Sequence, residues 1–523
     1  MKKIYALLLL GFLSKSVNTH AQKIELTVKS DYKNKVIPVT GKRASEKVND
    51  NLFLMFKEID KKKSAIVGYD AATLTQKMTI PLEYGQYSRP LFKFNPESNQ
   101  IFVLESYARS NIYTKKGHDF KASVYDLQGK LVKTKDVTLD IPLLSPLVMP
   151  KAFKAPVSAV VPSVLSTYEV NFSENGKYLY VLEKAPKKGK GALLFVYDIN
   201  LEELVKKEVK TGANEDIEAS AITNNGEMVL VIADKKDKAA FLKLDATGKE
   251  LSRVPAKHQV GPKESFGSYN IKIAGERVLV TTEKNFNTSE LMAIHVFDLD
   301  FTNKASKLYK TKEFDKGYVA QLYNKVNDKD VLHGGQMLSK KFDRPKLIKS
   351  MKVQQILVEG SSIYLVSEAI NNTSTTRTTS MPVGTTGQTT TSSKTIPLIF
   401  AEDILVTKFE GGENTWNSVI GRNFMVKDLR AADMTQSMVS QSNTNIHILT
   451  TESSRDKNNI SAYARTVNKA TGEISSPKRI NENKFVTFSN FACWLSPDQV
   501  VLLRTNKAFA GNGGYSLEKV SLN

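Results

Sequence analysis

The chain has 523 residues, and 74 Lys and Arg against 54 Asp and Glu give it a formal net charge of +20. Hydrophobic residues make up 41% and aromatic residues 9%, which is enough for a packed core and excludes a wholly disordered chain. The single cysteine, Cys493, excludes an intramolecular disulfide and a cysteine-based metal site. This length predicts about three domains of roughly 150 residues, unless the chain is built from repeats.

The amino terminus has the pattern of a secretory signal peptide. Lys2 and Lys3 precede an apolar run from Ile4 to Leu13, and a polar stretch then ends at Ala21. The run is about half as long as a membrane-spanning helix needs, and no later segment is long and apolar enough to span a bilayer. We therefore expect residues 1–21 to be removed and residues 22–523 to be secreted or periplasmic in a bacterium, with an uncleaved anchor or a buried helix as the alternatives.

The remaining chain repeats one pattern of strands and turns. The clearest copy runs from Tyr168 to Lys206, where Ser173–Gly176 forms a turn before a strand of alternating residues. Similar turns precede the strands that start near Ile101, Met228, Arg277 and Val500. The pattern predicts short antiparallel strands throughout.

A second repeated feature is a strand that runs into Asp and a turn. Because an Asp at this place accepts hydrogen bonds from turn N–H groups, and because it recurs in every copy, we interpret it as structural and not catalytic. The residues are Asp70, Asp126, Asp198, Asp245 and Asp298, with Asn468 in the same place in a weaker copy.

These features resemble the blades of WD40-like and YVTN-type β-propellers. The stretches NFSENGKYLYVLE (from Asn171) and WLSPDQVVLLRT (from Trp494) carry the resemblance, although the chain lacks a repeated Trp-Asp pair and contains only Trp416 and Trp494. The resemblance indicates no specific family. It implies an all-β fold, a propeller of seven or eight four-stranded blades, instead of two separate β-sandwiches.

About eight blade-like units fill residues 22–523, which we expect to form a single domain. The last unit has three evident strands, and residues 23–28 provide a fourth. Pairing of the two chain ends would close the ring and remove an open sheet edge.

Two insertions interrupt the repeat. Residues 141–165 contain five prolines among Leu, Val and Ala, so they predict an extended apolar connector that packs across its own blades or docks a partner. Its candidate binding residues are Pro142, Leu144, Pro146, Met149 and Phe153. Residues 371–394 are rich in Ser and Thr, and we expect a flexible loop at the tip of a hairpin, with glycosylation or ligand contact as the alternative.

The segment from Tyr318 to Ser350 fits no blade, and we expect a loop or a short extra strand pair. Its basic stretch contributes the other candidate binding residues, Lys340, Lys341, Arg344 and Lys346.

No known catalytic pattern occurs. The chain lacks HExxH, GxSxG and P-loop motifs, and its six His residues have no ligand spacing, so we assign no catalytic residue, metal or cofactor. His295 alternates with apolar neighbours, which is typical of a half-buried strand residue. His residues of different blades could still meet at one metal ion without any regular spacing in the sequence.

The positive charge comes mainly from lysine, and no motif of nucleic-acid readers accompanies it, so we expect no nucleic acid. Our first hypothesis is a non-enzymatic platform of the bacterial envelope that binds an envelope protein or an anionic ligand. The alternative is a propeller hydrolase or lyase acting on an extracellular or envelope glycan or lactone. A third hypothesis is a structural subunit of a secretion or adhesion complex.

Overall fold

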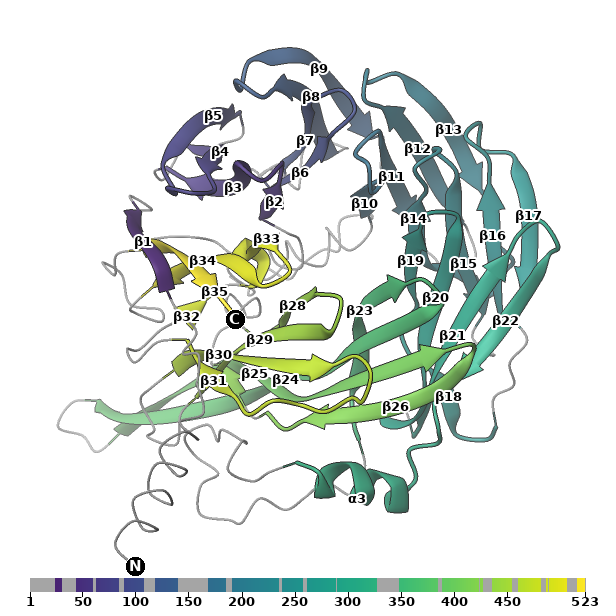
Figure 1. Cartoon of the computed structure of the whole chain (residues 1–523), viewed down its shortest axis with the longest axis vertical. Helices are drawn as coiled ribbons and strands as arrows, with labels where there is room; N and C mark the ends of the chain where they lie inside the picture. The colour runs from purple at the N-terminus through teal and green to yellow at the C-terminus, as the bar shows by residue number, and fades with distance from the viewer. Residues whose placement is uncertain are drawn as a thin grey trace, which may run out of the picture.

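The computed structural model describes residues 24–30, 44–59, 63–83, 89–107, 118–139, 168–184, 191–234, 238–256, 261–287, 289–326, 348–383, 388–422, 424–426, 435–453, 460–480, 486–487, 489–505 and 515–522. These residues form eight antiparallel sheets arranged in a ring (Figure 1). The predicted β-propeller is confirmed, with eight blades and not seven.

The first four blades follow one another along the chain, each with its strands paired in sequence order. Blade 1 holds β2 (Ser45–Lys47), β3 (Leu52–Glu58), β4 (Ser64–Asp70) and β5 (Gln76–Leu82), and blade 2 holds β6 (Arg89–Asn95), β7 (Gln100–Tyr107), β8 (His118–Asp126) and β9 (Leu131–Leu139). Blade 3 holds β10 (Tyr168–Phe172), β11 (Tyr178–Lys184), β12 (Ala192–Asp198) and β13 (Glu203–Val209), and blade 4 holds β14 (Glu215–Ile222), β15 (Met228–Asp234), β16 (Ala239–Leu244) and β17 (Glu250–Pro255).

Blades 5 to 7 keep this order with small additions. Blade 5 divides its first strand into β18 (Glu264–Phe266) and β19 (Asn270–Ala274), followed by β20 (Arg277–Phe286), β21 (Glu290–Asp300) and β22 (Ala305–Lys310). Blade 6 holds β23 (Met351–Glu359), β24 (Ser362–Val383), β25 (Gln388–Glu410), β26 (Glu413–Ile420) and the short β27 (Phe424–Val426). Blade 7 holds β28 (Met438–Gln441), β29 (Asn445–Ser453), β30 (Ile460–Asn468) and β31 (Lys478–Arg479).

Blade 8 closes the ring by joining the two ends of the chain. Its inner strands β32 (Val486–Thr487) and β33 (Cys493–Ser496) flank a short 3-10 helix, η5 (Ser489–Phe491), and pair with β34 (Gln499–Thr505). β35 (Tyr515–Ser521) then pairs with β1 (Ile24–Ser30), which opposes Val28 to Leu517. The predicted pairing of the chain ends is confirmed, and it completes the last blade by covering the edge of β35.

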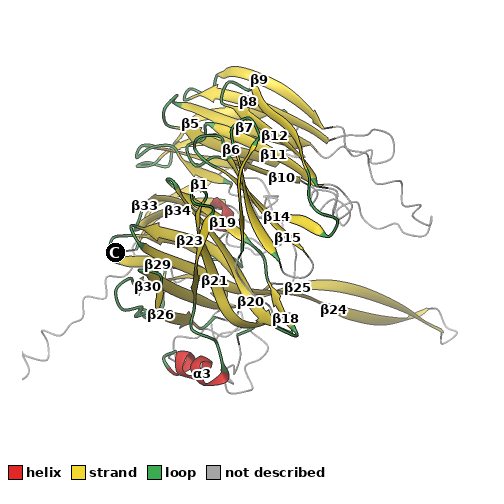
Figure 2. Cartoon of the chain, turned by 90° about the vertical axis from the view of Figure 1, so that its right-hand side faces the viewer, coloured by secondary structure: helices red, strands yellow, loops and turns green. Residues whose placement is uncertain are grey.

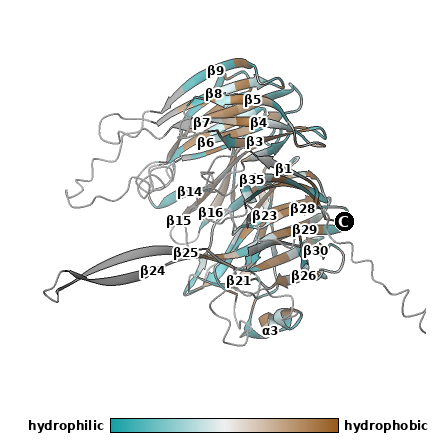
Figure 3. Cartoon of the chain, turned by 90° about the vertical axis from the view of Figure 1, so that its left-hand side faces the viewer, coloured by the Kyte–Doolittle hydropathy of each residue, from teal (hydrophilic) through white to brown (hydrophobic). Residues whose placement is uncertain are grey.

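The apolar core lies between neighbouring blades, because side chains on opposite faces of a strand point to different neighbours. In β11, Tyr180 and Leu182 join a cluster with blade 4, whereas Leu179 and Val181 join a cluster with blade 2. Figure 3 shows the corresponding hydrophobic colouring on strands such as β29. This explains why the second strands are apolar on both faces and not on one.

The two faces of the ring carry different connections. Because all pairings are antiparallel, connections from first to second and from third to fourth strands lie on one face, which we call the turn face. The other connections lie on the opposite face, which we call the loop face. Tight turns join the strands on the turn face, whereas the strands that flank the long connections 108–117, 140–167, 311–350 and 506–514 end and begin at the loop face. Long loops held by a rigid scaffold are common places for functional residues.

The Asp residues cap turns on the turn face, as predicted. The Asp126 carboxylate accepts hydrogen bonds from the N–H groups of Gln128 and Lys130 at 2.9 and 2.8 Å. Equivalent bonds are made by Asp70, Asp198, Asp245 and Asn468.

One assignment in that series was wrong. In blade 5 the turn is capped by Asp300, which accepts from the N–H of Asn303 at 2.9 Å. Asp298 instead binds the Arg277 guanidinium at 2.8 and 3.0 Å. The spacing in the sequence could not separate two carboxylates that lie two residues apart on the same strand face.

Glycines in these turns let each blade approach the next one closely. Gly129, Gly248, Gly412 and Gly472 all have positive φ, between 74° and 100°. A Cβ atom at each would lie 2.7–3.0 Å from an atom on the outermost strand of the preceding blade. Side chains of those outer strands also donate to the turns: Ser418 Oγ bonds the Gly472 carbonyl at 2.6 Å.

Two segments differ from their predicted structure. Residues 371–394 were expected to form a flexible loop, but β24 and β25 continue as paired strands out to Val383 and Gln388, and the hairpin projects from the ring (Figure 2). Thr favours strands, so a Ser/Thr-rich composition is compatible with this ribbon. The segment from Tyr318 begins with a helix, α3 (Lys316–Asn324), whose first turn is capped by Asp315, and not with a strand.

The close contact at Gly472 yields a stability prediction. Gly472→Ala should lower the free energy of unfolding by about 2–4 kcal/mol, because it adds left-handed strain and forces Trp416 to move. Gly275→Ala is the matched control, since Gly275 has a φ of 62° and nothing lies within 4 Å of its Cβ position. The free energy of unfolding of this control should fall by only about 1–2 kcal/mol. Urea denaturation measures both, and equal losses would contradict the packing argument.

Candidate functional site

The residues predicted to bind a partner lie outside the described residues. Pro142, Leu144, Pro146, Met149 and Phe153 belong to the connection between β9 and β10, and Lys340, Lys341, Arg344 and Lys346 to the connection between α3 and β23. Both connections join a fourth strand to the first strand of the next blade. The strands that flank both connections end and begin at the loop face, although the two connections are far apart in sequence.

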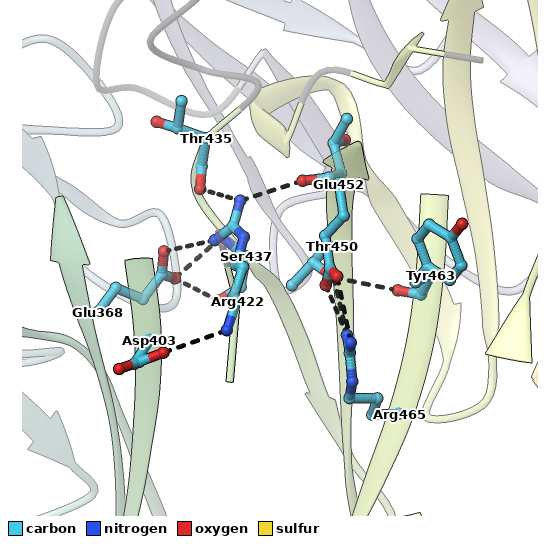
Figure 4. A network of polar contacts seen from close by, with 10 residues as sticks. Glu368, Asp403, Arg422, Thr435, Ser437, Thr450, Glu452, Tyr463 and Arg465 are labelled. Atoms are coloured by element: carbon cyan, nitrogen blue, oxygen red, sulfur yellow. Dashed lines mark hydrogen bonds and ion pairs between the residues drawn. The ribbon is translucent and has the colours of Figure 1, made fainter. Parts of the chain in front are cut away.

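Beneath the loop face, blades 6 and 7 share a buried network of charged side chains, shown in Figure 4. Arg422 lies just after β26, is fully buried, and reaches Glu368 of β24 at 3.5 Å. Its guanidinium also donates to the carbonyls of Thr435 at 2.5 Å and Thr451 at 3.4 Å. We call the residues joined in this way the Arg422 network: Glu368, Arg422, Thr435, Ser437, Thr450, Thr451, Glu452 and Arg465.

The two carboxylates of the Arg422 network have different partners, one in the following blade and one in its own blade. Glu368 accepts from the N–H of Ser437 at 2.9 Å and from its hydroxyl, just before β28 begins. In blade 7, Arg465 makes a two-point contact with Glu452 at 2.6 and 3.2 Å. The two arginines and two glutamates balance in charge, which is the arrangement that buried ions require.

Asp403 links α3 to the Arg422 network through two hydrogen bonds. The Tyr323 hydroxyl donates to the Asp403 carboxylate of β25, whose other oxygen accepts from the N–H of Arg422 at 3.2 Å. Burial raises the pKa of Asp403 to about 6, and the two hydrogen bonds act in the opposite direction. The helix that opens the connection 311–350 is thus fixed to the Arg422 network.

Blade 5 holds a further buried carboxylate in an equivalent role. Glu283 of β20 is fully buried and accepts from the N–H of Val353, in the first strand of blade 6, at 2.6 Å. Burial raises the pKa of Glu283 to about 7, and the Val353 N–H acts in the opposite direction. On the neighbouring strand, His295 lies in β21 as predicted and packs against Phe266, but at 5% exposed it is buried and not half-buried.

These buried charges join neighbouring blades and are shielded from solvent. Glu283, Glu368, Glu452 and Arg422 have at most 1% of their surface exposed, so a substrate in solution does not reach them. No cluster of three or more His, Cys, Asp or Glu that could hold a metal ion occurs in the described part of the chain. The Arg422 network lies beneath the loop face and joins blades 6 and 7.

Sequence reasoning missed the Arg422 network. Its members come from two blades and lie far apart in the chain, with Glu368 and Arg422 separated by 54 residues. The one signal was a Glu near the end of several second strands, as in IFVLES, YLYVLEK and RVLVTTE, which ends at Glu283.

Comparison with known proteins does not show which family the chain belongs to. No protein-family model and no curated protein match the chain. Among solved structures, it is similar to the polysaccharide lyase Uly1, with 11% identity over 96% of this chain and 100% of that chain and a TM-score of 0.40. A PL25 ulvan lyase matches with 10% identity over 95% and 96% of the chains (TM-score 0.36), and the WD40 domain of SCAP from fission yeast with 9% identity over 94% and 98% (TM-score 0.28). The β-propeller assignment rests on the strand pairing of this chain itself.

Substitutions that break the Arg422 network should lower the free energy of unfolding. Arg422→Met leaves the buried Glu368 charge without its cation and should lower the free energy of unfolding by about 3–5 kcal/mol. Combining it with Glu368→Gln removes both charges and should restore part of that loss. Arg253→Met is the control, since the Arg253–Glu250 pair is solvent-exposed, and it should change stability by less than about 1 kcal/mol. Denaturant titration measures the wild type, Arg422→Met, Glu368→Gln, the double variant and Arg253→Met. A double variant that loses the sum of the two single losses would contradict the pairing.

Glu283 should make stability depend on pH. The pKa of Glu283 is higher in the folded chain than in the unfolded chain. Its contribution to the free energy of unfolding is therefore fully present below about pH 4.5 and is lost as the pH rises through 7. Glu283→Gln should therefore gain stability relative to the wild type as the pH rises from 5 to 8, by at least about 1 kcal/mol. Unfolding measured across this range gives the difference, in which other titrating groups cancel. A difference that stays constant with pH would contradict the assignment.

Proposed function

We propose that the chain is an exported, non-enzymatic β-propeller of the bacterial envelope that binds a protein or an anionic ligand through its loop face. The observation that carries this proposal is the unequal use of the two faces. Tight turns make up the turn face, and every long connection between blades begins and ends on the loop face. Rigid scaffolds with elaborated loops on one face are typical of binding proteins.

The buried charges support a binding role over a catalytic one. Glu283, Glu368 and Arg422 hold neighbouring blades together beneath the loop face and are shielded from solvent. A catalytic acid or base must come within hydrogen-bond reach of its substrate, which these groups do not. The formal charge of +20 favours an acidic partner.

Export is the second part of the proposal and rests on the pattern of residues 1–21. No helix in the described part of the chain is long and apolar enough to cross a membrane. Expression in a bacterial host followed by amino-terminal sequencing should give Gln22 as the first residue of the exported protein. An intact Met1 on protein retained in the cytoplasm would contradict export.

A loop-face variant tests the binding role. Residues 141–165 are replaced by a Gly/Ser linker of equal length, and the immobilised protein is incubated with envelope extract. The proteins or glycans that the wild type retains should fall at least ten-fold. The matched control on the turn face is Glu97→Ala with Lys177→Ala, which removes one exposed ion pair and should change nothing. Equal losses from both variants would contradict the assignment to the loop face. Turnover of envelope glycans or lactones by the wild type would overturn the non-enzymatic role.

A further inference from the structure

Strands β24 and β25 of blade 6 extend far beyond their blade. They contain 22 and 23 residues, whereas no other described strand is longer than the 11 residues of β21. Their antiparallel pairing continues outward through residues 371–383 and 388–398, which we call the ribbon. Because the ribbon joins a second strand to a third, it leaves the ring at the loop face, and Figure 2 shows it projecting from the blades.

Both edges of the ribbon are open in the described part of the chain. β23 pairs with β24 only as far as Ala369, and β27 pairs with β25 only as far as Ile399. Farther out, no described strand pairs with either edge. A two-stranded ribbon is marginally stable in water, and stable sheets need three or more strands. An additional strand along one edge would therefore stabilise the ribbon.

The residues of β24 do not block such an addition. Proteins commonly protect an open edge with charged residues, proline or a bulge. From Asn371 to Met381, β24 contains one charged residue and no proline, and its pairing with β25 is continuous beyond Ile370. Most of these residues are Thr or Ser, and Thr favours strands. On β25, Pro397 interrupts the edge close to the blade, so β24 offers the longer continuous edge.

The charges of the ribbon are all of one sign. Arg377 and Lys394 are the only charged residues in the segment 371–401, and they are direct partners across the two strands. Paired residues lie on the same face of a sheet, and like charges in such a pair are destabilising. The nearest acidic residue along β25 is Glu402, whose carboxylate already accepts from the Asn371 side chain at 3.0 Å. An anionic group beside the cationic pair would remove the repulsion.

The open edge and the cationic pair together select the occupant. A small anion would leave the edge unpaired, and a second copy of the ribbon would add positive charge. An extended acidic segment supplies both backbone hydrogen bonds and carboxylates. Building on the proposed binding role of the loop face, we propose that the ribbon captures an extended acidic protein segment. The segment adds as a strand along β24 and places carboxylates beside Arg377 and Lys394.

Two ribbon variants and one control test the protein side of this contact. Arg377→Thr combined with Lys394→Thr neutralises the cationic pair. The control is Lys133→Thr with Lys310→Thr, which removes two exposed lysines from β9 and β22 and so lowers the net charge equally.

The second variant removes the ribbon and keeps the blade. Residues 373–398 are replaced by Asn-Gly, which closes the pair of Asn372 and Ile399 with a two-residue turn. Circular dichroism and thermal unfolding check that all variants fold as the wild type does.

The probe is a labelled peptide in which Glu alternates with Thr, and its counterpart carries Lys in place of Glu. Two further forms of the Glu/Thr peptide are methylated on the backbone N–H groups of either its odd or its even positions. Only one of these sets faces the edge of β24 in an added strand, so the two methylated forms separate strand pairing from simple charge attraction.

The Glu/Thr peptide should bind the wild type and the lysine control equally. It should bind the neutralised ribbon at least about ten-fold more weakly and the ribbon-deleted variant not at all. One methylated form should keep its affinity and the other should lose it. Equal affinity for the ribbon variants, equal affinity of the two methylated forms, or equal binding of the Lys/Thr peptide would overturn the proposal. A dimer in sedimentation that only the ribbon-deleted variant loses would overturn it in favour of self-association.

The envelope-extract assay separates this proposal from the general role of the loop face. The ribbon-deleted variant should lose the acidic proteins that the wild type retains. If it retains them while the variant of residues 141–165 loses them, capture by the ribbon is wrong and the loop-face role stands. If neither variant changes retention, the loop-face role itself is wrong.

Discussion

The contact between each blade and the next is the interaction on which the whole structure depends. On the turn face, glycines such as Gly248 and Gly472 allow a turn to touch the outermost strand of the preceding blade. Towards the other face, carboxylates such as Glu283 and Glu368 accept N–H groups from the start of the following blade. Between these two levels lie apolar clusters shared by adjacent sheets. A single four-stranded blade cannot bury both of its faces, so stability comes from repetition around the ring.

Closure extends this principle to the chain ends. Blade 8 takes its outermost strand from the amino terminus, so that β1 pairs with β35. One apolar cluster includes residues of blades 8, 1 and 2, such as Leu503, Phe53 and Phe94, and also Phe424 of blade 6. The joint between the first and last blades is thus packed like the others. Such a closed scaffold leaves the loop connections free to diverge without loss of the fold.

The charged side chains fall into a buried group and an exposed group with different roles. Buried ions such as Arg422 and Glu452 are paired with other buried groups, where their role is to fix one blade against another. Most lysines of the described residues are exposed or half-buried, and the net charge of the chain favours the acidic partner that we propose.

The sequence by itself determined the all-β class, the blade-sized period, the turns capped by residues such as Asp126 and the strand that closes the ring, because these follow from local alternation and turn chemistry. It left open whether the ring had seven or eight blades, placed the cap of blade 5 at Asp298 and not Asp300, and gave no sign that Arg422 would meet Glu368. Only the tertiary structure decided those points. Pairings between blades depend on the three-dimensional registration of sheets that are distant in the chain, and local residue patterns do not encode that registration.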